Sequence, residues 1–419
     1  MRTALLAILL SGVVLAQQPG TNYDEAKVPA YTLPELLVMS NGQRVRGAAD
    51  WTMRREEIRS LLESKMFGRA PTRQAETTFA LDSVDKAALG GRAIRKQVSI
   101  HAAGKAMSLL LYLPAKVTHP VPVFVGLGFS PNQSVSVDPG IRLAGMWVQD
   151  KATKAISLQP AQEASRGSAA SRWQVETVVA RGFGLATIYY GDIEPDIAGA
   201  ATLGIRGTYL KPGQDAPGDD EWGAIAAWAW GLSRVVDYLE RDSDVDATHL
   251  ALVGHSRLGK AALWAGAMDA RFGIVISNDS GEGGAAISRR RFGETVADLN
   301  NRFPHWFCGN YKHYSGREDE MPFDSHMLLA LVAPRPLYVA SAVEDQWADP
   351  RGEFLSAVAA SEVYELLGTT GIGTAQMPPI NQPVGDGVRY HVRTGKHDIT
   401  AYDWQQYLDF ADRHFRRTP

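Results

Sequence analysis

Residues 250–264 read LALVGHSRLGKAALW, and three features of this stretch predict the fold. A short apolar run stops at Gly254, Ser256 follows two residues later, and an alanine-rich helical pattern begins at once. A strand, a tight turn and a helix in this order lift a serine hydroxyl above the carboxyl edge of a parallel sheet. The spacing is Gly-x-Ser-x-x-Gly, with Gly259 one position later than in the usual pentapeptide. We interpret Ser256 as a nucleophile; the alternative is a serine that caps a helix or binds phosphate.

Short apolar runs and helical patterns alternate on both sides of this stretch. The predicted strands are residues 94–100, 107–113, 121–125, 185–189, 250–253, 274–277, 337–340 and 389–392. The predicted helices are residues 51–66, 222–240, 354–367 and 402–415. The first two strands flank an Ala-Gly turn and are expected to form a hairpin. The alternation predicts the α/β-hydrolase fold, a three-layer sandwich in which helices cover both faces of a mostly parallel central sheet.

A single catalytic domain is predicted over residues 17–419, because no repeat or low-complexity linker divides them. Residues 130–176 have little periodicity and many Ser, Gly and Gln residues. We interpret them as a surface insertion near the active edge, with a plain solvated loop as the alternative. The apolar face of the first predicted helix is expected to consist of Trp51, Met53, Ile58, Leu61, Leu62 and Met66.

Composition limits the classes of partner. Of the 419 residues, 45% are hydrophobic and 21% are charged, as in a globular protein with a large core. The formal net charge of −3 does not indicate a polyanionic partner, so we expect no nucleic acid to bind. Cys308 is the only cysteine, cannot form an internal disulfide, and is expected to be buried. We expect a monomer.

Residues 1–16 have the pattern of a secretory signal peptide. Arg2 gives a short basic start, an apolar stretch follows, and small residues end it at Ala16. The stretch is too short to span a bilayer, and no cysteine follows it to carry a lipid anchor. We therefore expect a secreted or periplasmic protein without a membrane anchor.

A serine hydroxyl needs an imidazole to take its proton and a carboxylate to hold that imidazole in the correct tautomer. In this fold, the acid and the histidine follow the serine in loops after late strands. His397 lies between the last predicted strand and the last predicted helix, which is the expected place for the general base. His391 lies inside a strand pattern and His414 inside a helix, so packing or solvent exposure explains both better.

Two aspartates are candidates for the acid. Asp345 follows the strand at 337–340, where the acid is expected, although Glu344 and Asp349 are close rivals. Asp279 follows the strand at 274–277 and could reach the imidazole from the neighbouring strand end. Both aspartates could contribute, and each could instead be a turn or capping residue.

The oxyanion that forms on attack needs donors that are already in place. We expect one to be the backbone N–H of Arg257 and another to come from residues 126–129, after the strand at 121–125. The guanidinium of Arg257 could also lean toward the developing charge, or it could pair with a nearby carboxylate. We expect no cofactor and no metal ion, because no cluster of His, Cys and carboxylate residues has the spacing of a metal site.

The stretch around Ser256 resembles the Gly-[Cys/His]-Ser-Arg-x-Gly-Lys signature of the glucuronoyl esterases, carbohydrate esterase family 15. Residues 278–286 are similar to the acid-bearing loop of that family. Residues 303–307, 344–350 and 395–398 are similar to its bacterial members. The similarity spans most of residues 30–415, and the motifs occur in the family's order.

The resemblance implies hydrolysis of the ester between 4-O-methyl-glucuronic acid on xylan and lignin alcohols. It implies that the Arg257 side chain belongs to the oxyanion site, that Lys260 and Glu294 contact sugar hydroxyls, and that Trp347 contacts the uronate. The chain departs from the family at two places. Many members carry glutamate where Asp279 stands, which favours Asp345, and a glutamine of the sugar site has no clear match near Asn301 and Arg302.

The leading hypothesis is a secreted serine esterase that forms an acyl-enzyme on Ser256, with a small uronate ester or a glucuronoxylan–lignin ester as substrate. A second hypothesis is an acetyl-xylan or other carbohydrate deacetylase on the same scaffold. A third, from another class, is a carbohydrate-binding pseudoenzyme; the presence of Ser256, His397 and two candidate acids speaks against it.

Overall fold

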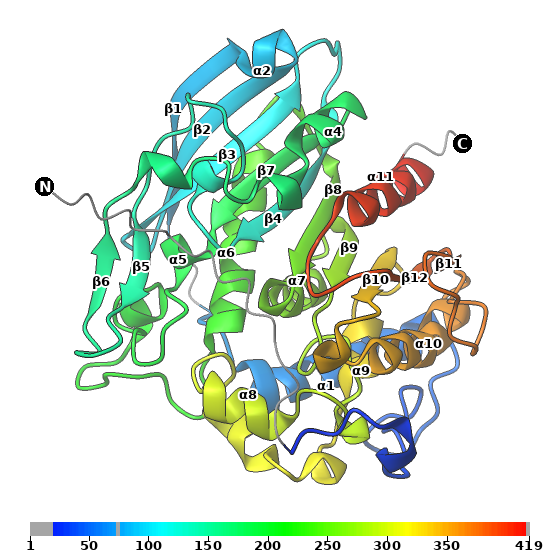
Figure 1. Cartoon of the computed structure of the whole chain (residues 1–419). Coiled ribbons are helices and arrows are strands. Elements are labelled where there is room, and N and C mark those ends of the chain that lie inside the picture. The colour runs from blue at the N-terminus through cyan, green and yellow to red at the C-terminus, as the bar shows by residue number, and fades with distance from the viewer. Residues whose placement is uncertain (1–19, 73–75, 416–419) are drawn as a thin grey trace, which may run out of the picture.

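The structure, a computed structural model, describes residues 20–72 and 76–415 (Figure 1). The predicted signal peptide, residues 1–16, lies outside the described residues. Within the described ranges, ten strands form one sheet and two further strands form a separate hairpin. Each helix in these ranges is too short or too polar to cross a bilayer.

The large sheet has the strand order β1-β2-β3-β7-β4-β8-β9-β10-β12-β11. In chain order, its strands are β1 (Thr77–Ala87), β2 (Ala93–Ala102), β3 (Lys105–Pro114), β4 (Val121–Gly128), β7 (Gly184–Tyr189), β8 (Val245–His255), β9 (Phe272–Asn278), β10 (Leu337–Ala342), β11 (Val384–Gly385) and β12 (Val388–Arg393). The six strands from β7 to β12 in the spatial order are parallel, while β1, β2 and β3 continue the sheet as an antiparallel meander. Parallel strands end at the same edge, so the loops after β8, β9, β10 and β12 meet there.

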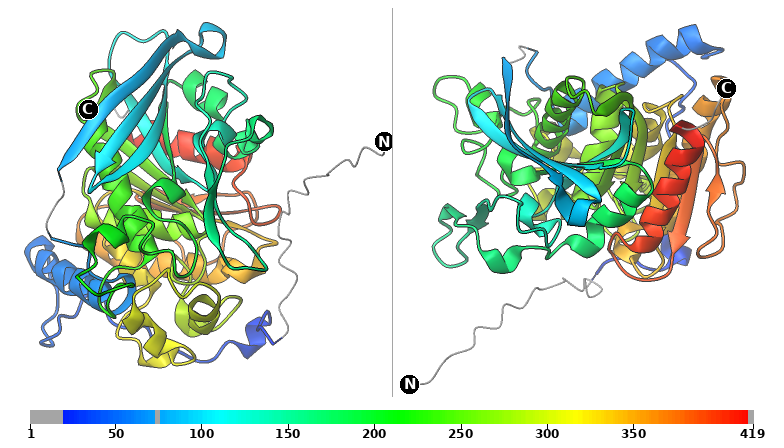
Figure 2. Two further views of the ribbon diagram at one scale, coloured as in Figure 1. Left: turned by 90° about the vertical axis from the view of Figure 1, so that its left-hand side faces the viewer. Right: turned by 90° about the horizontal axis from the view of Figure 1, so that it is seen from above.

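Helices cover both faces of the sheet. Along β8, Leu250 and Leu252 join a core with α6 (Ala224–Leu239) and α7 (Arg257–Met268), whereas Ala251 and Val253 join a core with α11 (Ala401–Phe415). Successive side chains of a strand point to opposite faces, which is why this buried strand is apolar throughout. Figure 2 shows α11 in red on one side of the sheet and α1 (Ala48–Leu62) in blue on the other. The predicted three-layer α/β sandwich is confirmed.

The other helices are shorter or lie beside these layers. They are α2 (Ala88–Gly91), α3 (Ala170–Trp173), α4 (Val175–Ala180), α5 (Tyr190–Ile193), α8 (Val296–Arg302), α9 (Ser325–Ala330) and α10 (Pro350–Leu366). Every predicted strand and helix has a counterpart, and β2 and β3 form the expected hairpin. The strand β1 was not predicted: it lies at the sheet edge, and a register shift between Leu81 and Ser83 breaks its apolar alternation.

The predicted apolar face of α1 is wrong at Met53. Trp51, Ile58 and Leu62 are buried, but Met53 is 55% exposed and Arg54 is buried instead. The Arg54 guanidinium donates to the carbonyl oxygens of the lead-in segment, from Nε to Leu36 at 3.1 Å and from Nη2 to Glu35 at 3.0 Å. An arginine whose donors are satisfied can thus occupy a position that periodicity assigns to an apolar side chain.

Residues 130–176 contain more order than the sequence indicates. They include the separate hairpin of β5 (Met146–Gln149) and β6 (Ile156–Gln159), drawn apart from the main sheet in Figure 1, and they end with α3. The predicted burial of Cys308 is confirmed: the residue is 2% exposed, and burial raises the pKa of its thiol.

Candidate active site

Ser256 lies at the tight turn between β8 and α7, as predicted. Its backbone has φ 58° and ψ −131°, a left-handed conformation that costs a residue with a side chain about 1–3 kcal/mol. The backbone N–H of Ser256 donates to the carbonyl oxygen of Asn278 at 2.9 Å, which ties the turn to β9. A Cβ at Gly254 would lie 2.1 Å from the carbonyl oxygen of Leu258, so the close approach of strand and helix requires glycine there.

His397 and Asp345 form a hydrogen-bonded pair at the same edge. His397 follows β12, Asp345 follows β10, and His397 Nδ1 lies 2.5 Å from Asp345 Oδ2. A carboxylate accepts, so Nδ1 carries the proton and Nε2 is left with a lone pair. The ring centroid of His255, the residue before Ser256, lies 4.5 Å from that of His397, which places the imidazole beside the turn.

The two rivals of Asp345 lie elsewhere. Glu344 is exposed. Asp349 precedes α10, accepts from the backbone N–H of Gly352 at 2.9 Å, and accepts from Arg290 Nε at 2.7 Å. A capping role paired with an arginine therefore explains Asp349.

Asp279 also lies close to the imidazole, but it is not the residue that bonds it. One oxygen each of Asp279 and Asp345 and one nitrogen of His397 lie within 4.8 Å of one another. Asp279 is 1% exposed, its Oδ1 is buried without a hydrogen-bond partner, and its Oδ2 lies 3.4 Å from Arg393 Nη2. Burial, and next the charge of Asp345, raise the pKa of Asp279 well above its usual value. The charged form of Asp279 is therefore disfavoured where it lies.

Every predicted site residue except Asp345 lines one cavity of about 390 Å³. Lys260 and Glu294 are buried in its wall at 3% and 7% exposure, so neither is a solvated surface charge. Lys260 Nζ donates to the carbonyl oxygen of Ser280 at 2.7 Å and lies 3.6 Å from Glu294 Oε2. Burial raises the pKa of Glu294, and the charge of Lys260 opposes that rise.

Trp347 is 9% exposed, and the backbone N–H of Glu294 donates to its carbonyl oxygen at 2.9 Å. Arg302 lines the same cavity, with Cζ 5.2 Å from the Trp347 ring centroid. From the sequence, no role was predicted for Arg302; it was noted only because it lies where a glutamine of the family's sugar site has no clear match. The structure places this cation at the aromatic wall of the cavity.

Of the two arrangements that the sequence left open for Arg257, the structure shows the pairing with a carboxylate. Its Nη1 donates to Asp196, and its Cζ lies 4.9 Å from the ring centroid of Trp306 and 5.6 Å from that of Phe129. The same side chain lines the cavity with Ser256. Residues 126–128 belong to β4 rather than to the predicted loop, and Phe129, which follows the strand, lines the cavity.

Several residues of this site were missed or left without a role. Asp196 was missed: it lies beyond α5 rather than directly after the predicted strand at 185–189, and its partners come from distant segments. His255 and Trp306 were quoted only within motifs. Arg172 also lines the cavity from the end of the 130–176 segment, and its Nε lies 2.6 Å from Asp398 Oδ1.

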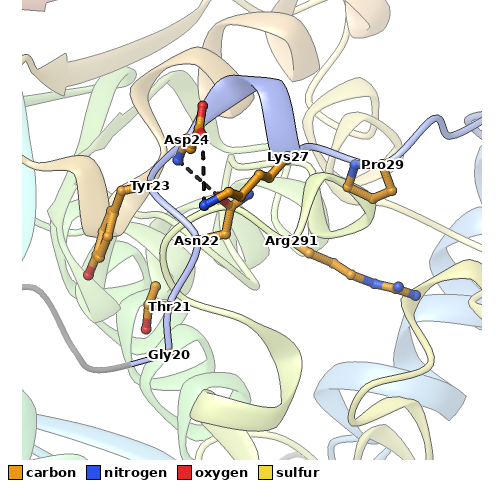
Figure 3. Close-up of a pocket in the computed structure, with 8 residues that line it drawn as sticks. All are labelled: Gly20, Thr21, Asn22, Tyr23, Asp24, Lys27, Pro29 and Arg291. Carbon is orange, nitrogen blue, oxygen red and sulfur yellow. Dashed lines mark hydrogen bonds and ion pairs between the residues drawn. The ribbon is translucent and has the colours of Figure 1, made fainter.

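A second hollow, of about 770 Å³, lies at the beginning of the described chain and contains none of the predicted site residues. Figure 3 shows its wall, where Lys27 Nζ lies 3.8 Å from Asp24 Oδ2 and the N–H of Asp24 donates to Asn22 Oδ1 at 2.9 Å. Arg291, on its far side, pairs with Glu318 and Asp319. The charged groups of this wall are therefore paired. Ser256 and His397, the candidates for catalysis, line the smaller cavity instead.

Comparison with known proteins gives relatives along nearly the whole chain. Residues 217–368 match a family model described as "Glucuronyl esterase, fungi". A carbohydrate esterase named MZ0003, from an unknown prokaryotic organism, is 51% identical over 406 residues, which cover 96% of this chain and 94% of the relative.

Two solved structures are similar in fold and in sequence. A glucuronoyl esterase from Solibacter usitatus has a TM-score of 0.89 and 57% identity, and the match covers 93% of this chain and all of that one. A glucuronoyl esterase of carbohydrate esterase family 15 from Teredinibacter turnerae has a TM-score of 0.79 and 32% identity, over 94% and 92% of the two chains. The chain therefore belongs to the glucuronoyl esterases of carbohydrate esterase family 15, and it is a carboxylic ester hydrolase with the α/β-hydrolase fold.

Proposed function

We propose that this chain hydrolyses alcohol esters of 4-O-methyl-glucuronic acid through an acyl-enzyme on Ser256. The observation that carries the proposal is the meeting of a strained serine turn and a His397–Asp345 pair at one cavity. A serine, an imidazole and a carboxylate in this arrangement supply a nucleophile, a general base and a group that orients the base.

In the first half of the reaction, Ser256 Oγ attacks the acyl carbon and His397 Nε2 takes its proton. Asp345 accepts from Nδ1–H and stabilises the imidazolium that forms. The backbone N–H of Arg257 at the start of α7 and the Arg257 guanidinium face the oxygen that becomes negative. The bond to the alcohol then breaks, and the alcohol leaves with the proton held by His397.

In the second half, a water molecule attacks the acyl-enzyme while His397 takes its proton. The carbon–oxygen bond to Ser256 breaks, and Ser256 recovers its proton from His397. The products are the uronic acid and the free enzyme. None of these steps needs a redox change.

We propose that the cavity wall away from Ser256 selects the uronate. The cavity volume of about 390 Å³ falls in the range of small-molecule sites. Lys260 and Glu294 form a buried ion pair there, which suits hydrogen bonding to sugar hydroxyls, and Trp347 adds an aromatic surface.

The test compares kcat/KM of the purified chain on benzyl and methyl glucuronates with that on an aryl acetate. We expect the glucuronates to be preferred, and we expect Ser256→Ala to abolish turnover and labelling by a serine-directed phosphonate while thermal unfolding is unchanged. A preference for the acetate would support a deacetylase, and a wild-type chain that neither turns over nor becomes labelled would support a pseudoenzyme.

We also propose that residues 1–16 direct export of this enzyme to the periplasm or the exterior. Sequencing the N-terminus of the mature protein after expression in a bacterium tests this proposal. Material that retains Met1 and stays in the cytoplasm would contradict it.

A further inference from the structure

Asp196 lies in the segment that follows β7 and α5, and no proposed step uses it. Its side chain is 4% exposed, and it faces donors from two other parts of the chain. Its Oδ2 accepts from Arg257 Nη1, and its Oδ1 accepts from Trp306 Nε1 at 2.6 Å and lies 2.8 Å from His305 Nε2. Both carboxylate oxygens are therefore acceptors, and a carboxylate is what this position requires.

The charge state of this cluster follows from its contacts. Burial alone would raise the pKa of Asp196, but the hydrogen bond from His305 and the charge of Arg257 lower it to about 2. The other nitrogen of His305, Nδ1, is buried without a hydrogen-bond partner. Because a carboxylate oxygen only accepts, His305 Nε2 is the nitrogen that donates to Asp196. Arg257 is the guanidinium cation that pairs with Asp196.

The Arg257 guanidinium is held by aromatic rings near its plane as well as by the hydrogen bond from Nη1. Its guanidinium lies near the rings of Trp306 and Phe129, and also 5.6 Å from the ring centroid of Phe303. Its Nε is buried with no hydrogen-bond partner. A guanidinium has five N–H donors in one plane, so fixing Nη1 and the plane fixes the directions of the remaining donors.

We propose that Asp196 is a positioning residue for Arg257, holding the guanidinium so that its remaining donors face the acyl oxygen during attack. The inference rests on the proposed function, because it takes Arg257 as an oxyanion donor. It also gives residues 303–307 a role: His305 and Trp306 hold Asp196, and the Trp306 ring faces the guanidinium. Donors held in place beforehand need no reorganisation when the charge develops, which is how they lower the barrier.

The decisive variant is Asp196→Asn. Asparagine has the same shape, but one carboxylate oxygen becomes an NH₂ group, which then faces either Arg257 or the His305–Trp306 pair, all of which are donors. We expect kcat to fall by roughly tenfold to a hundredfold with KM within about twofold, since the loss is in the transition state. In an Arg257→Ala background, we expect the same change to lower kcat by less than about twofold, because its target is gone.

Asp242→Asn is the matched control. Asp242 is also buried and accepts from Lys96 Nζ at 2.6 Å and from Tyr238 Oη at 2.9 Å, but it lies in the turn before β8, at the opposite edge of the sheet. We expect this variant to lower the melting temperature without lowering kcat. If Asp242→Asn lowers kcat as much as Asp196→Asn does, the effect is one of general destabilisation and the inference fails.

Two results of the double-mutant cycle would overturn the inference. One is an equal loss from Asp196→Asn in both backgrounds, and the other is a rise in KM with kcat retained. The cycle is run on a glucuronate ester and on an aryl acetate. A wild type that cleaves only the acetate defeats the proposed function, while the cycle on that acetate still decides the role of Asp196.

Discussion

The loops after β9 and β10 each bring an aspartate to the same histidine, yet the two carboxyl groups differ in their hydrogen bonds. Asp345 Oδ2 lies 2.5 Å from His397 Nδ1 and accepts the hydrogen bond of that ring nitrogen. Asp279 lies within 4.8 Å but is buried with an unpartnered oxygen, and its pKa is raised well above the usual value. Neighbouring strand ends carrying the same residue type thus supply one carboxyl group that bonds the imidazole and one whose charged form is disfavoured by burial.

The difference teaches that position at the sheet edge is not enough to define a catalytic acid. Two carboxylates so close together repel each other, so ionising one raises the pKa of the other. A hydrogen-bond donor at a carboxyl group favours its charged form. Asp345 has the imidazole N–H, whereas the nearest cation to Asp279, Arg393, also bonds Asp403 through Nε at 2.7 Å.

The largest expected effect is that of Asp345→Asn. An amide at this position can donate to Nδ1 and so favours the wrong tautomer of His397, which leaves no lone pair at Nε2 for the Ser256 proton. We expect kcat to fall by about 10³–10⁴, measured by steady-state kinetics on a glucuronate ester. Glu344→Gln, which changes an exposed neighbour, is the matched control and should keep wild-type kcat. A loss of less than tenfold in Asp345→Asn would show that another group orients the imidazole.

The sequence predicts this edge well because its signals are local. The order of strand, turn and helix around Ser256, and the positions of His397 and Asp345 after late strands, follow from periodicity and from the parallel topology. The sequence favoured Asp345 but left Asp279 open, because which carboxyl group bonds His397 depends on distances between loops 50 or more residues apart in the chain. Asp196 and Arg54 were missed for a related reason: a buried charge is recognised by its partners, and those partners come from distant segments.

Glu353 on α10 ties the two loops together, and removing it is expected to have the next largest effect. Its Oε1 accepts from the N–H of Gly281 at 2.9 Å and from Ser280 Oγ at 3.2 Å, and its Oε2 lies 2.6 Å from Ser341 Oγ of β10. Burial raises the pKa of Glu353 to about 8, so the group is mostly protonated at neutral pH. We expect Glu353→Ala to lower the free energy of unfolding by about 2–4 kcal/mol, since it leaves two buried donors, Gly281 N–H and Ser280 Oγ, without an acceptor and Ser341 Oγ without its partner.

Glu353→Gln is the matched control for this prediction. Its amide oxygen can accept from the β9 loop and its NH₂ group can donate to Ser341, as the protonated acid does. In urea denaturation at neutral pH, we expect it to retain most of the stability that the alanine variant loses. Equal losses in the two variants would show that Glu353 is ionised in the folded state.

The smallest expected effect on activity is that of Asp279→Asn. If Asp279 is already neutral, an amide of the same shape should leave kcat within about threefold of the wild type near neutral pH, in contrast to Asp345→Asn. A loss of a hundredfold or more would instead make Asp279 a second ionised acid for His397.

The same variant should change how stability depends on pH. The folded-state pKa of Asp279 is raised, so its contribution to stability is fully present below the unfolded pKa of about 3.9 and is lost as pH rises toward the folded value. Asparagine does not titrate, so the stability of Asp279→Asn should rise relative to the wild type between about pH 4 and neutral pH. Urea denaturation at several pH values measures this difference, and a constant difference across that range would mean that Asp279 titrates alike in the folded and unfolded chains.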